Sequence, residues 1–333
     1  MILVSGGSGL VGSHLLRLLI KKGEAVRATY RSSSSIKACA KVFEAFNETA
    51  HFEEIDWVQA DLLDLTALEK AFEGVDQVYH SAAMVSFKRK DRPTLFEVNV
   101  QGTANMVNLA LDFKVKKFCF VSSVAAIGKY RDKDCSDEQA SWKQEGGTSD
   151  YSISKYYAEN EVWRGAAEGL PIVIVNPSTV LGYGDLKRSS NKLFEKVDRG
   201  LPFYPGGSNG FVGVDDVVQC MYALMESEIQ GERFILSSEN ISYQQLFNSI
   251  AEAMGKKPPS FELQKWMATL YMYLDSFLFY LGLQDSPITR ANLTTAFNHK
   301  CFDTAKIKDR LGFDFEPIEA VTKRHGGFYR RES

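Results

Sequence analysis

The sequence has few of the residues that mark metal-binding, disulfide-rich or nucleic-acid-binding proteins. Its five cysteines, at positions 39, 119, 135, 220 and 301, are scattered and form no CxxC pair. No His/Cys cluster has the spacing of a zinc site, so we expect no bound metal and reduced thiols, as in a cytoplasmic protein. A net charge of −3 without a Lys/Arg-rich block gives no indication of nucleic-acid binding.

Membrane and targeting signals are also missing. The nearest approach to a transmembrane run, residues 266–283, is interrupted by Asp275, so we expect no transmembrane segment. A strand-like run begins at Met1 and leaves no room for a signal peptide, which favours a cytoplasmic location. The 333 residues are 44% hydrophobic and 24% charged, which is ordinary for a globular protein with a large core.

Short apolar runs alternate with helix-like segments through much of the chain. The strand-like runs are residues 1–5, 25–30, 56–60, 75–80, 117–122, 172–175 and 234–236. The helix-like segments follow residues 9, 64, 98 and 150. This alternation predicts an α/β fold with a doubly wound parallel sheet of the Rossmann type, in which ligands bind beyond the carboxyl ends of the strands.

The pattern loosens after residue 178, where Gly, Pro, Ser and Asn become frequent. We predict a sheet domain of residues 1–177 and about 212–237, interleaved with a smaller substrate-binding lobe of about 178–211 and 238–333. The apolar residues 266–283 fit a buried lobe helix, an apolar cap over a lipophilic substrate, or a contact with a membrane surface. The first of these interpretations is favoured.

A glycine-rich turn follows the first strand-like run. Residues 6–12 read G-G-S-G-L-V-G, which fits G-x-G-x-x-G from residue 7 and G-x-x-G-x-x-G from residue 6. Between a strand and a helix, such glycines let the backbone turn tightly and approach a pyrophosphate at the helix N-terminus. The turn therefore predicts a dinucleotide site that includes Gly6, Ser8, Gly9, Leu10, Val11 and Gly12.

The end of the second strand-like run decides between NAD and NADP. An acidic residue there would bind the ribose hydroxyls, but the sequence has Arg31 followed by Ser32–Ser35. Arg31 can pair with a 2′-phosphate, so we predict NADP(H), with NAD(H) and a solvated surface arginine as the alternatives. Asp61 and Leu62 follow the third run and would flank the adenine, although Asp61 could also cap the next helix.

Tyr151 and Lys155 stand four residues apart in Y-S-I-S-K, so they share one face of a helix. A nearby ammonium favours the phenolate and lowers the pKa of a tyrosine from its usual value of about 10. Such a tyrosine can act as an acid or base near neutral pH. Because the pair comes after a dinucleotide turn and after Ser122-Ser123 at a strand end, it predicts an active site.

These motifs together resemble the extended short-chain dehydrogenase/reductase family, also called the NAD-dependent epimerase/dehydratase family. The resemblance covers nearly the whole chain. The motifs that carry it are residues 6–12, D-L at 61–62, H-S-A-A at 80–83, N-V-Q-G-T at 99–103, V-S-S at 121–123, Y-S-I-S-K at 151–155 and V-D-D-V at 214–217. V-R-A-T-Y-R at 26–31 is similar to the dihydroflavonol-reductase-like branch. V-N-P-S-T at 175–179, with residues 287–302 and 311–313, is similar to relatives labelled hopanoid-associated sugar epimerases.

The resemblance implies a role for each matched residue. Tyr151 would transfer the proton, and Lys155 would hold the nicotinamide ribose and lower the pKa of the tyrosine. Ser123 would hydrogen-bond the substrate oxygen, because the family's serine lies five residues before the glycine matched by Gly128. Asn99 would tie a backbone group or a water near the lysine, or begin a helix. Further cofactor contacts are implied for Ser81, Ala82, Ala83, Val121, Ser122, Pro177 and Ser178.

Two departures from the family pattern bear on the reaction. Residues 124–127 are apolar and lack the acidic residues of sugar dehydratases, and the NAD-holding carboxylate of nucleotide-sugar epimerases is absent. The resemblance then implies an NADP(H)-dependent carbonyl reductase or alcohol dehydrogenase. Its substrate would be a small-molecule carbonyl, alcohol or sugar. The alternatives are a nucleotide-sugar epimerase with tightly bound NAD and a cofactor-sensing regulator.

The residues after the strands that face the site are candidates for the substrate pocket. They are Met84, Val85, Ser86, Phe87, Lys129, Tyr130 and Tyr183, and each could equally belong to a lid or to the surface. Family members often dimerise through the helices equivalent to residues 99–113 and 151–167, which implies a homodimer.

Overall fold

The structure is a computed structural model that describes residues 1–130, 133–186, 189–270, 272 and 296–332. Seven parallel strands form its central sheet, in the order β10-β6-β5-β4-β1-β2-β3. They are β1 (Ile2–Ser5), β2 (Val26–Tyr30), β3 (Asp56–Gln59), β4 (Gln77–His80), β5 (Lys117–Val121), β6 (Ile172–Pro177) and β10 (Glu232–Leu236). The predicted doubly wound parallel sheet is therefore confirmed, with its order reversing between β1 and β4, where such sheets bind ligands.

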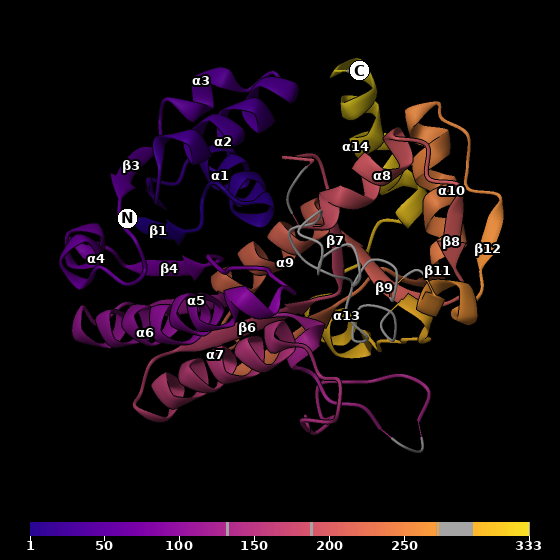
Figure 1. Ribbon diagram of the computed structural model, residues 1–333. Helices are drawn as coiled ribbons and strands as arrows, with labels where there is room; N and C mark the ends of the chain where they lie inside the picture. The colour runs from indigo at the N-terminus through magenta and orange to yellow at the C-terminus, as the bar shows by residue number, and fades with distance from the viewer. Residues whose placement is uncertain (131–132, 187–188, 271, 273–295, 333) are drawn as a thin grey trace.

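Helices cover both faces of this sheet (Figure 1). One face is covered by α1 (Leu10–Lys21) and α9 (Val214–Glu226). The other is covered by α4 (Leu65–Phe72), α6 (Gly102–Asp112) and α7 (Asp150–Ala167). Side chains alternate between the two layers, since Ile2 and Val4 pack with α1 whereas Leu3 packs with α4 and α6. Burial on both faces explains why the strands have continuous apolar runs.

Further helical elements lie in the connections between these strands and helices. They are α2 (Ser33–Ala45), α3 (Thr49–Phe52), η1 (Arg89–Asp91), α5 (Arg92–Phe96), η2 (Glu97–Gln101) and η3 (Val124–Ala126). The element η2 is a π-helical turn that runs directly into α6. The sequence pattern did not predict α2 or α3, which fill the connection between β2 and β3.

The C-terminal elements form a separate group at one end of the sheet (Figure 1). Its strands are β7 (Thr179–Leu181), β9 (Ser208–Gly213) and β11 (Glu239–Ser242) in one sheet, and β8 (Phe203–Pro205) and β12 (Phe261–Leu263) in a pair. Its helical elements are η4 (Ser189–Asn191), α8 (Lys192–Asp198), α10 (Tyr243–Met254) and α14 (Ile318–Glu332), whereas α13 (Ala305–Leu311) packs against β10 of the central sheet. A capping box formed by Ser242 and Gln245 begins α10, which packs on α14 around Ile250 and Val321. The division into two interleaved domains stays a prediction.

The apolar segment 266–283 lies mostly outside the described residues. In its described part Trp266 and Leu270 are exposed, whereas Ala268 and Met272 are buried. Within the described part of the chain, we find no helix that combines the length and the apolar character needed to cross a membrane. The same residues include no group of three or more His, Cys, Asp or Glu that could hold a metal ion.

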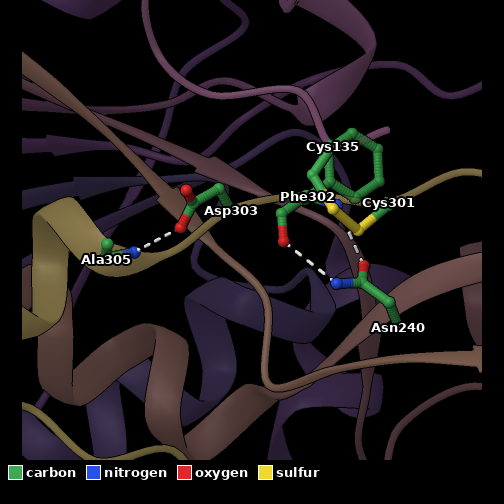
Figure 2. The surroundings of a disulfide bond; sticks show 6 residues. All are labelled: Cys135, Asn240, Cys301, Phe302, Asp303 and Ala305. Atoms are coloured by element: carbon green, nitrogen blue, oxygen red, sulfur yellow. Dashed lines mark hydrogen bonds between the residues drawn. A yellow bond between two sulfur atoms is a disulfide. The ribbon is translucent and has the colours of Figure 1, made fainter. Parts of the chain in front are cut away.

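The prediction of reduced thiols is wrong for two of the five cysteines. Cys135 and Cys301 form a disulfide across a sequence separation of 166 residues, while Cys39, Cys119 and Cys220 are free and buried. Backbone hydrogen bonds reinforce the junction, since Ser136 N donates to Cys301 O at 2.9 Å. Phe302, the residue after Cys301, is held by the Asn240 amide, which donates to its carbonyl and accepts from its N–H, both at 3.0 Å (Figure 2). The loop that precedes α7 is thereby fixed to the C-terminal part of the chain.

Candidate active site

The glycine-rich turn is pressed against the loop that follows β4. Gly6 has a φ of +72°, and a Cβ atom on it would lie 2.6 Å from the backbone N and Cα of Ala82. Gly9 N donates to Gly6 O at 2.9 Å, and a Cβ atom on Gly12 would lie 2.1 Å from the same oxygen. Only glycines allow the turn to lie this close to both its neighbours. Gly9, the N-cap of α1, is exposed, so an anion such as a pyrophosphate could reach this helix N-terminus.

Arg31 is exposed at the end of β2, together with the Ser32, Ser33 and Ser34 that begin α2. Its backbone carbonyl accepts a hydrogen bond from Gln59 Nε2 at 3.3 Å, which fixes the main chain while the guanidinium extends from the surface. A cation and several hydroxyls at a helix N-terminus form a chemically suitable site for a phosphate.

Two roles were considered for Asp61, a contact with the adenine and the cap of the next helix, and the structure decides the second. Asp64, not Asp61, caps α4, because its Oδ1 accepts from Ala67 N at 3.1 Å. Asp61 Oδ1 accepts from Leu63 N at 3.0 Å and lies at the end of β3. Leu62 is buried against Gly102 at the start of α6. Asp61 therefore does not cap α4, and its contact with an adenine stays a prediction.

Tyr151 and Lys155 lie on the first turns of α7, whose N-cap is Ser149. The Lys155 side chain is buried, its Nζ donates to Val121 O at 2.8 Å, and it lies 4.4 Å from the centre of the Phe120 ring. Burial lowers the pKa of Lys155 to about 7, although the Glu159 carboxylate acts in the opposite direction. The structure thus places the ammonium at the carboxyl end of β5.

The pKa of Tyr151 differs from the sequence-based expectation. Burial raises it above the ordinary value, and a hydrogen bond with the Ser123 side chain lowers it in part. The predicted lowering by Lys155 is not seen, because desolvation of the phenol is the larger effect and the ammonium contacts the Val121 carbonyl. The structure nevertheless brings Tyr151 and Ser123 together.

The two adjacent serines have different surroundings. Ser123 is half-buried at the start of η3, where its Oγ accepts from Ala125 N at 3.1 Å. Ser122 is buried, and its Oγ donates to a Glu159 carboxylate oxygen at 2.5 Å. The Ser122 hydroxyl is therefore engaged by a carboxylate inside the protein, and the cofactor contact that the resemblance implied for this residue stays a prediction.

Asn99 is buried inside the π-helical turn η2, which differs from the helix start considered for it. Its Oδ1 accepts from Met84 N at 2.7 Å, and its Nδ2 donates to Met84 O and to Ser154 Oγ, both at 3.0 Å. Asn99 thus fixes the loop after β4 to the helix that carries Tyr151 and Lys155.

Sequence reasoning assigned no role to His80, which connects Asn99 to Ser5 at the end of β1, just before the glycine-rich turn. Its Nδ1 is 2.6 Å from Ser5 Oγ, and its Nε2 is 3.0 Å from Thr103 Oγ1. Thr103 Oγ1 donates in turn to Asn99 O at 2.6 Å. Burial lowers the pKa of His80 to about 3, so the ring is neutral and the chain of hydrogen bonds is fixed near neutral pH.

The remaining predicted cofactor residues lie at strand ends. Ser81 Oγ donates to Ser5 O at 2.7 Å, so this hydroxyl is engaged within the protein. Pro177 ends β6. Ser178 N donates to Leu236 O at 2.9 Å, and its buried Oγ has no hydrogen-bond partner within the described residues. Ala82 and Ala83 follow β4, beside the glycine turn.

Four of the predicted substrate residues lie in the loop after β4. The Phe87 ring meets the Tyr151 ring edge-on with centroids 5.7 Å apart, and 51% of its surface is exposed. Val85 is 45% exposed, and Met84 is half-buried. Ser86 Oγ instead donates to Asp91 Oδ2 at 2.6 Å. The loop therefore presents apolar surface next to Tyr151.

The other three substrate candidates have different positions. Lys129 is exposed, and Tyr130 donates its hydroxyl to Asp137 Oδ1 at 2.5 Å. Tyr183 is only 3% exposed and packs between Phe328 and Tyr329 in the core of the C-terminal part. Tyr183 is therefore part of this core, and its predicted contact with a substrate stays a prediction.

A parallel doubly wound sheet with a glycine turn after β1 and a Tyr-x-x-x-Lys helix after β5 defines an enzyme that uses a nicotinamide dinucleotide. The chain belongs to the NAD-dependent epimerase/dehydratase family, whose model matches residues 2–236. It is an oxidoreductase-type NAD(P)-binding enzyme of the extended short-chain dehydrogenase/reductase type, as predicted.

Similar proteins include both reductases and epimerases. A Synechocystis sp. protein that is provisionally named dihydroflavonol 4-reductase is 30% identical over 323 residues, covering 95% of this chain and 90% of its own. The sterol demethylase protein B of Methylococcus capsulatus is 30% identical over 259 residues, covering 77% and 75%. The crystal structure of gox2253 has a TM-score of 0.81 at 29% identity and covers 100% and 98%. The UDP-glucose 4-epimerase of Thermotoga maritima, at 22% identity, shares the fold with a TM-score of 0.77 and covers 99% of each chain.

Proposed function

We propose that the protein is an NADP(H)-dependent oxidoreductase that interconverts a carbonyl compound and a secondary alcohol. The observation that carries this proposal is the placement of Tyr151, Ser123 and Lys155 together at the carboxyl end of β5. An acid, a hydroxyl and a cation around one position are what the reduction of a carbonyl group needs.

The residues present fit a dinucleotide. Gly6 and Gly12 allow the turn to pack directly against Ala82 and Gly6 O, and a pyrophosphate would bind beside Ser8, Gly9, Leu10 and Val11 at the start of α1. Arg31 would hold the 2′-phosphate, Asp61 and Leu62 the adenine end, and Lys155 the nicotinamide ribose. The bound nicotinamide supplies or accepts the hydride.

The chain's own contribution is the proton. A phenol whose pKa lies above its ordinary value keeps its proton at neutral pH, so Tyr151 is the acid that reduction requires. Ser123 would hydrogen-bond the carbonyl oxygen and stabilise the negative charge that develops on it. Asn99 maintains the geometry by joining Met84 to α7.

The surface next to Tyr151 bears on the substrate. The exposed side chains of Phe87 and Val85 favour an apolar or aromatic carbonyl compound over a sugar, which would bring many hydroxyls to an apolar wall. Reduction by NADPH is also supported by the residue after β2, which is Arg31 and not the acidic residue that would bind the ribose hydroxyls of NAD. The homodimer through α6 and α7 stays a prediction. So does the cytoplasmic location, which the Cys135–Cys301 disulfide does not favour.

The second candidate is a nucleotide-sugar epimerase that keeps its NAD. The solved structures with this fold include UDP-glucose 4-epimerase and UDP-glucuronic acid 4-epimerase, the latter in complex with NAD. Purified protein that carries bound NAD and consumes no added cofactor would favour this function.

The test of the main proposal is Tyr151→Phe. We expect its turnover of a carbonyl substrate to fall by about 10²–10⁴-fold, the usual contribution of a general acid. NADPH binding, measured by quenching of tryptophan fluorescence, should be nearly unchanged, because the phenyl ring keeps its contact with Phe87. Unchanged turnover would refute the role of Tyr151.

A further inference from the structure

Glu159 is a buried carboxylate behind the active site. It lies on α7 one turn beyond Lys155 and two turns beyond Tyr151, and its exposure is 2%. A buried carboxylate without partners would be strongly unfavourable. Four side chains donate hydrogen bonds to it, namely Ser122 Oγ at 2.5 Å, Asn176 Nδ2 at 2.7 Å, Arg233 at 2.9 Å and Trp163 Nε1 at 3.4 Å.

One carboxylate oxygen of Glu159 connects two strands of the sheet at the active site. Oε2 accepts both from Ser122, which follows β5, and from Asn176, which belongs to β6. Asn176 Nδ2 also donates to the backbone carbonyl of Ser123 at 3.1 Å. Glu159 therefore fixes the position of Ser123 in two ways. It binds the side chain of the preceding residue, Ser122, and it binds Asn176, which holds the Ser123 carbonyl.

Charged groups lie on both sides of Glu159, toward the active site and away from it. Toward the site, the Lys155 ammonium lies one helical turn away, and the buried neutral His80 and the Tyr151 phenol are its titratable neighbours. On the other side, Arg233 of β10 pairs with Oε1 and also donates to Glu138 O at 3.0 and 2.5 Å. The negative charge of Glu159 is thus paired directly with Arg233 and acts on the Lys155 ammonium from one helical turn away.

We propose that Glu159 is a positioning residue of the active site: its carboxylate anchors the strand ends around Ser123 and provides the counter-charge for the Lys155 ammonium. This inference rests on the proposed function, because it assigns Ser123 and Lys155 their roles. This proposal is supported by the pKa of Lys155, which is about 7. Burial lowers this pKa, and the charge of Glu159 partly offsets that effect. Removal of the negative charge should therefore lower this pKa further.

The experiment is an NMR titration of protein labelled at the lysine ε-carbons, in which the Lys155 signal is the one missing from Lys155→Met. The wild-type midpoint should be near pH 7. In Glu159→Gln we expect it to fall by about one pH unit, which lowers the ammonium fraction at neutral pH about fivefold. Glu159→Asp keeps the charge and should restore the wild-type midpoint. Glu161→Gln, on the same helix but paired with Arg164, is the matched control and should not change it.

An unchanged midpoint in folded Glu159→Gln would overturn the proposal. If that variant does not fold, because the Arg233 guanidinium is left unpaired, Arg233→Gln is compared with the double variant Glu159→Gln/Arg233→Gln. The double variant should have the lower midpoint, and equal midpoints would overturn the proposal. The titration needs no substrate, so its outcome is separate from that of the proposed function, which fails if the wild-type protein consumes no NADPH with any carbonyl compound.

Activity gives a second readout that a purely structural role would not move. In Glu159→Gln the turnover should fall and its pH optimum should shift to lower pH, because Lys155 holds its proton only there. In Glu159→Asp the pH optimum should return to the wild-type position. A uniform loss of turnover at every pH, with an unshifted optimum, would contradict the counter-charge role.

Discussion

Gly6→Ala tests whether the glycine turn is fitted closely to the loop after β4. Alanine at a φ of +72° is strained, and its Cβ would lie 2.6 Å from Ala82 N and Cα, which are backbone atoms that cannot rotate away. The left-handed conformation costs about 1–2 kcal/mol, and overpacking adds about 1–3 kcal/mol. We therefore expect a loss of about 2–5 kcal/mol in the free energy of unfolding.

Gly23→Ala is the matched control, because Gly23 has a similar φ of +80° with no atom within 4 Å of the added Cβ. Its free energy of unfolding should fall only by the cost of the left-handed conformation, about 1–2 kcal/mol. For 333 residues the unfolding entropy is about 0.7 kcal/mol/K, so the expected decreases in Tm are about 3–7 °C for Gly6→Ala and about 1–3 °C for Gly23→Ala.

Thermal unfolding measured by circular dichroism, together with an NADPH titration, distinguishes the two glycine variants. Gly6→Ala should bind NADPH at least about tenfold more weakly, or about 1.4 kcal/mol, since the turn must move away from Ala82. Gly23→Ala, at the far end of α1, should bind it normally. If both variants lose equal stability and both bind NADPH like the wild type, the close approach of the turn to Ala82 has no energetic consequence and the reasoning is refuted.

Two further predictions concern cofactor choice and the disulfide. Arg31→Ala should abolish an NADPH-over-NADH preference of about tenfold, or about 1.4 kcal/mol, in a fluorescence titration, and an equal preference in both proteins would show that Arg31 does not contact the 2′-phosphate. Replacing Cys135 and Cys301 by serine should lower the free energy of unfolding by about 2–5 kcal/mol, because the bridge closes a separation of 166 residues. Thiol counting in non-reducing denaturant is the direct check, since three of five thiols should react in the wild type, and five reactive thiols would show that the bridge is absent.

The sheet and the active-site motifs could be predicted because each depends on local sequence. Strands buried on both faces need continuous apolar runs, as in β5 and β6, and a dinucleotide turn needs glycines at fixed spacing. The family and the enzyme class follow from the same motifs, and the comparisons confirm both.

The features that the sequence did not reveal depend on contacts between distant segments. Nothing near Cys135 indicates that Cys301 lies beside it, since only the folded chain brings the loop before α7 to the C-terminal part. Tyr183 follows a strand that faces the site, yet its ring turns into the lobe core. Glu159 looks like an ordinary polar residue of a helix. Only its spacing pointed to the site, because Glu159 is four residues after Lys155 and eight after Tyr151 and so lies on the same face of α7.

The most direct test of the central claim is the stoichiometry of the reaction. Purified protein is incubated with NADPH and a set of apolar and aromatic carbonyl compounds, and the NADPH oxidised is compared with the alcohol formed. The proposed function predicts equal amounts of both, with no nicotinamide cofactor already bound to the purified protein. Bound NAD, together with interconversion of a nucleotide sugar and no net consumption of NADPH, would contradict it.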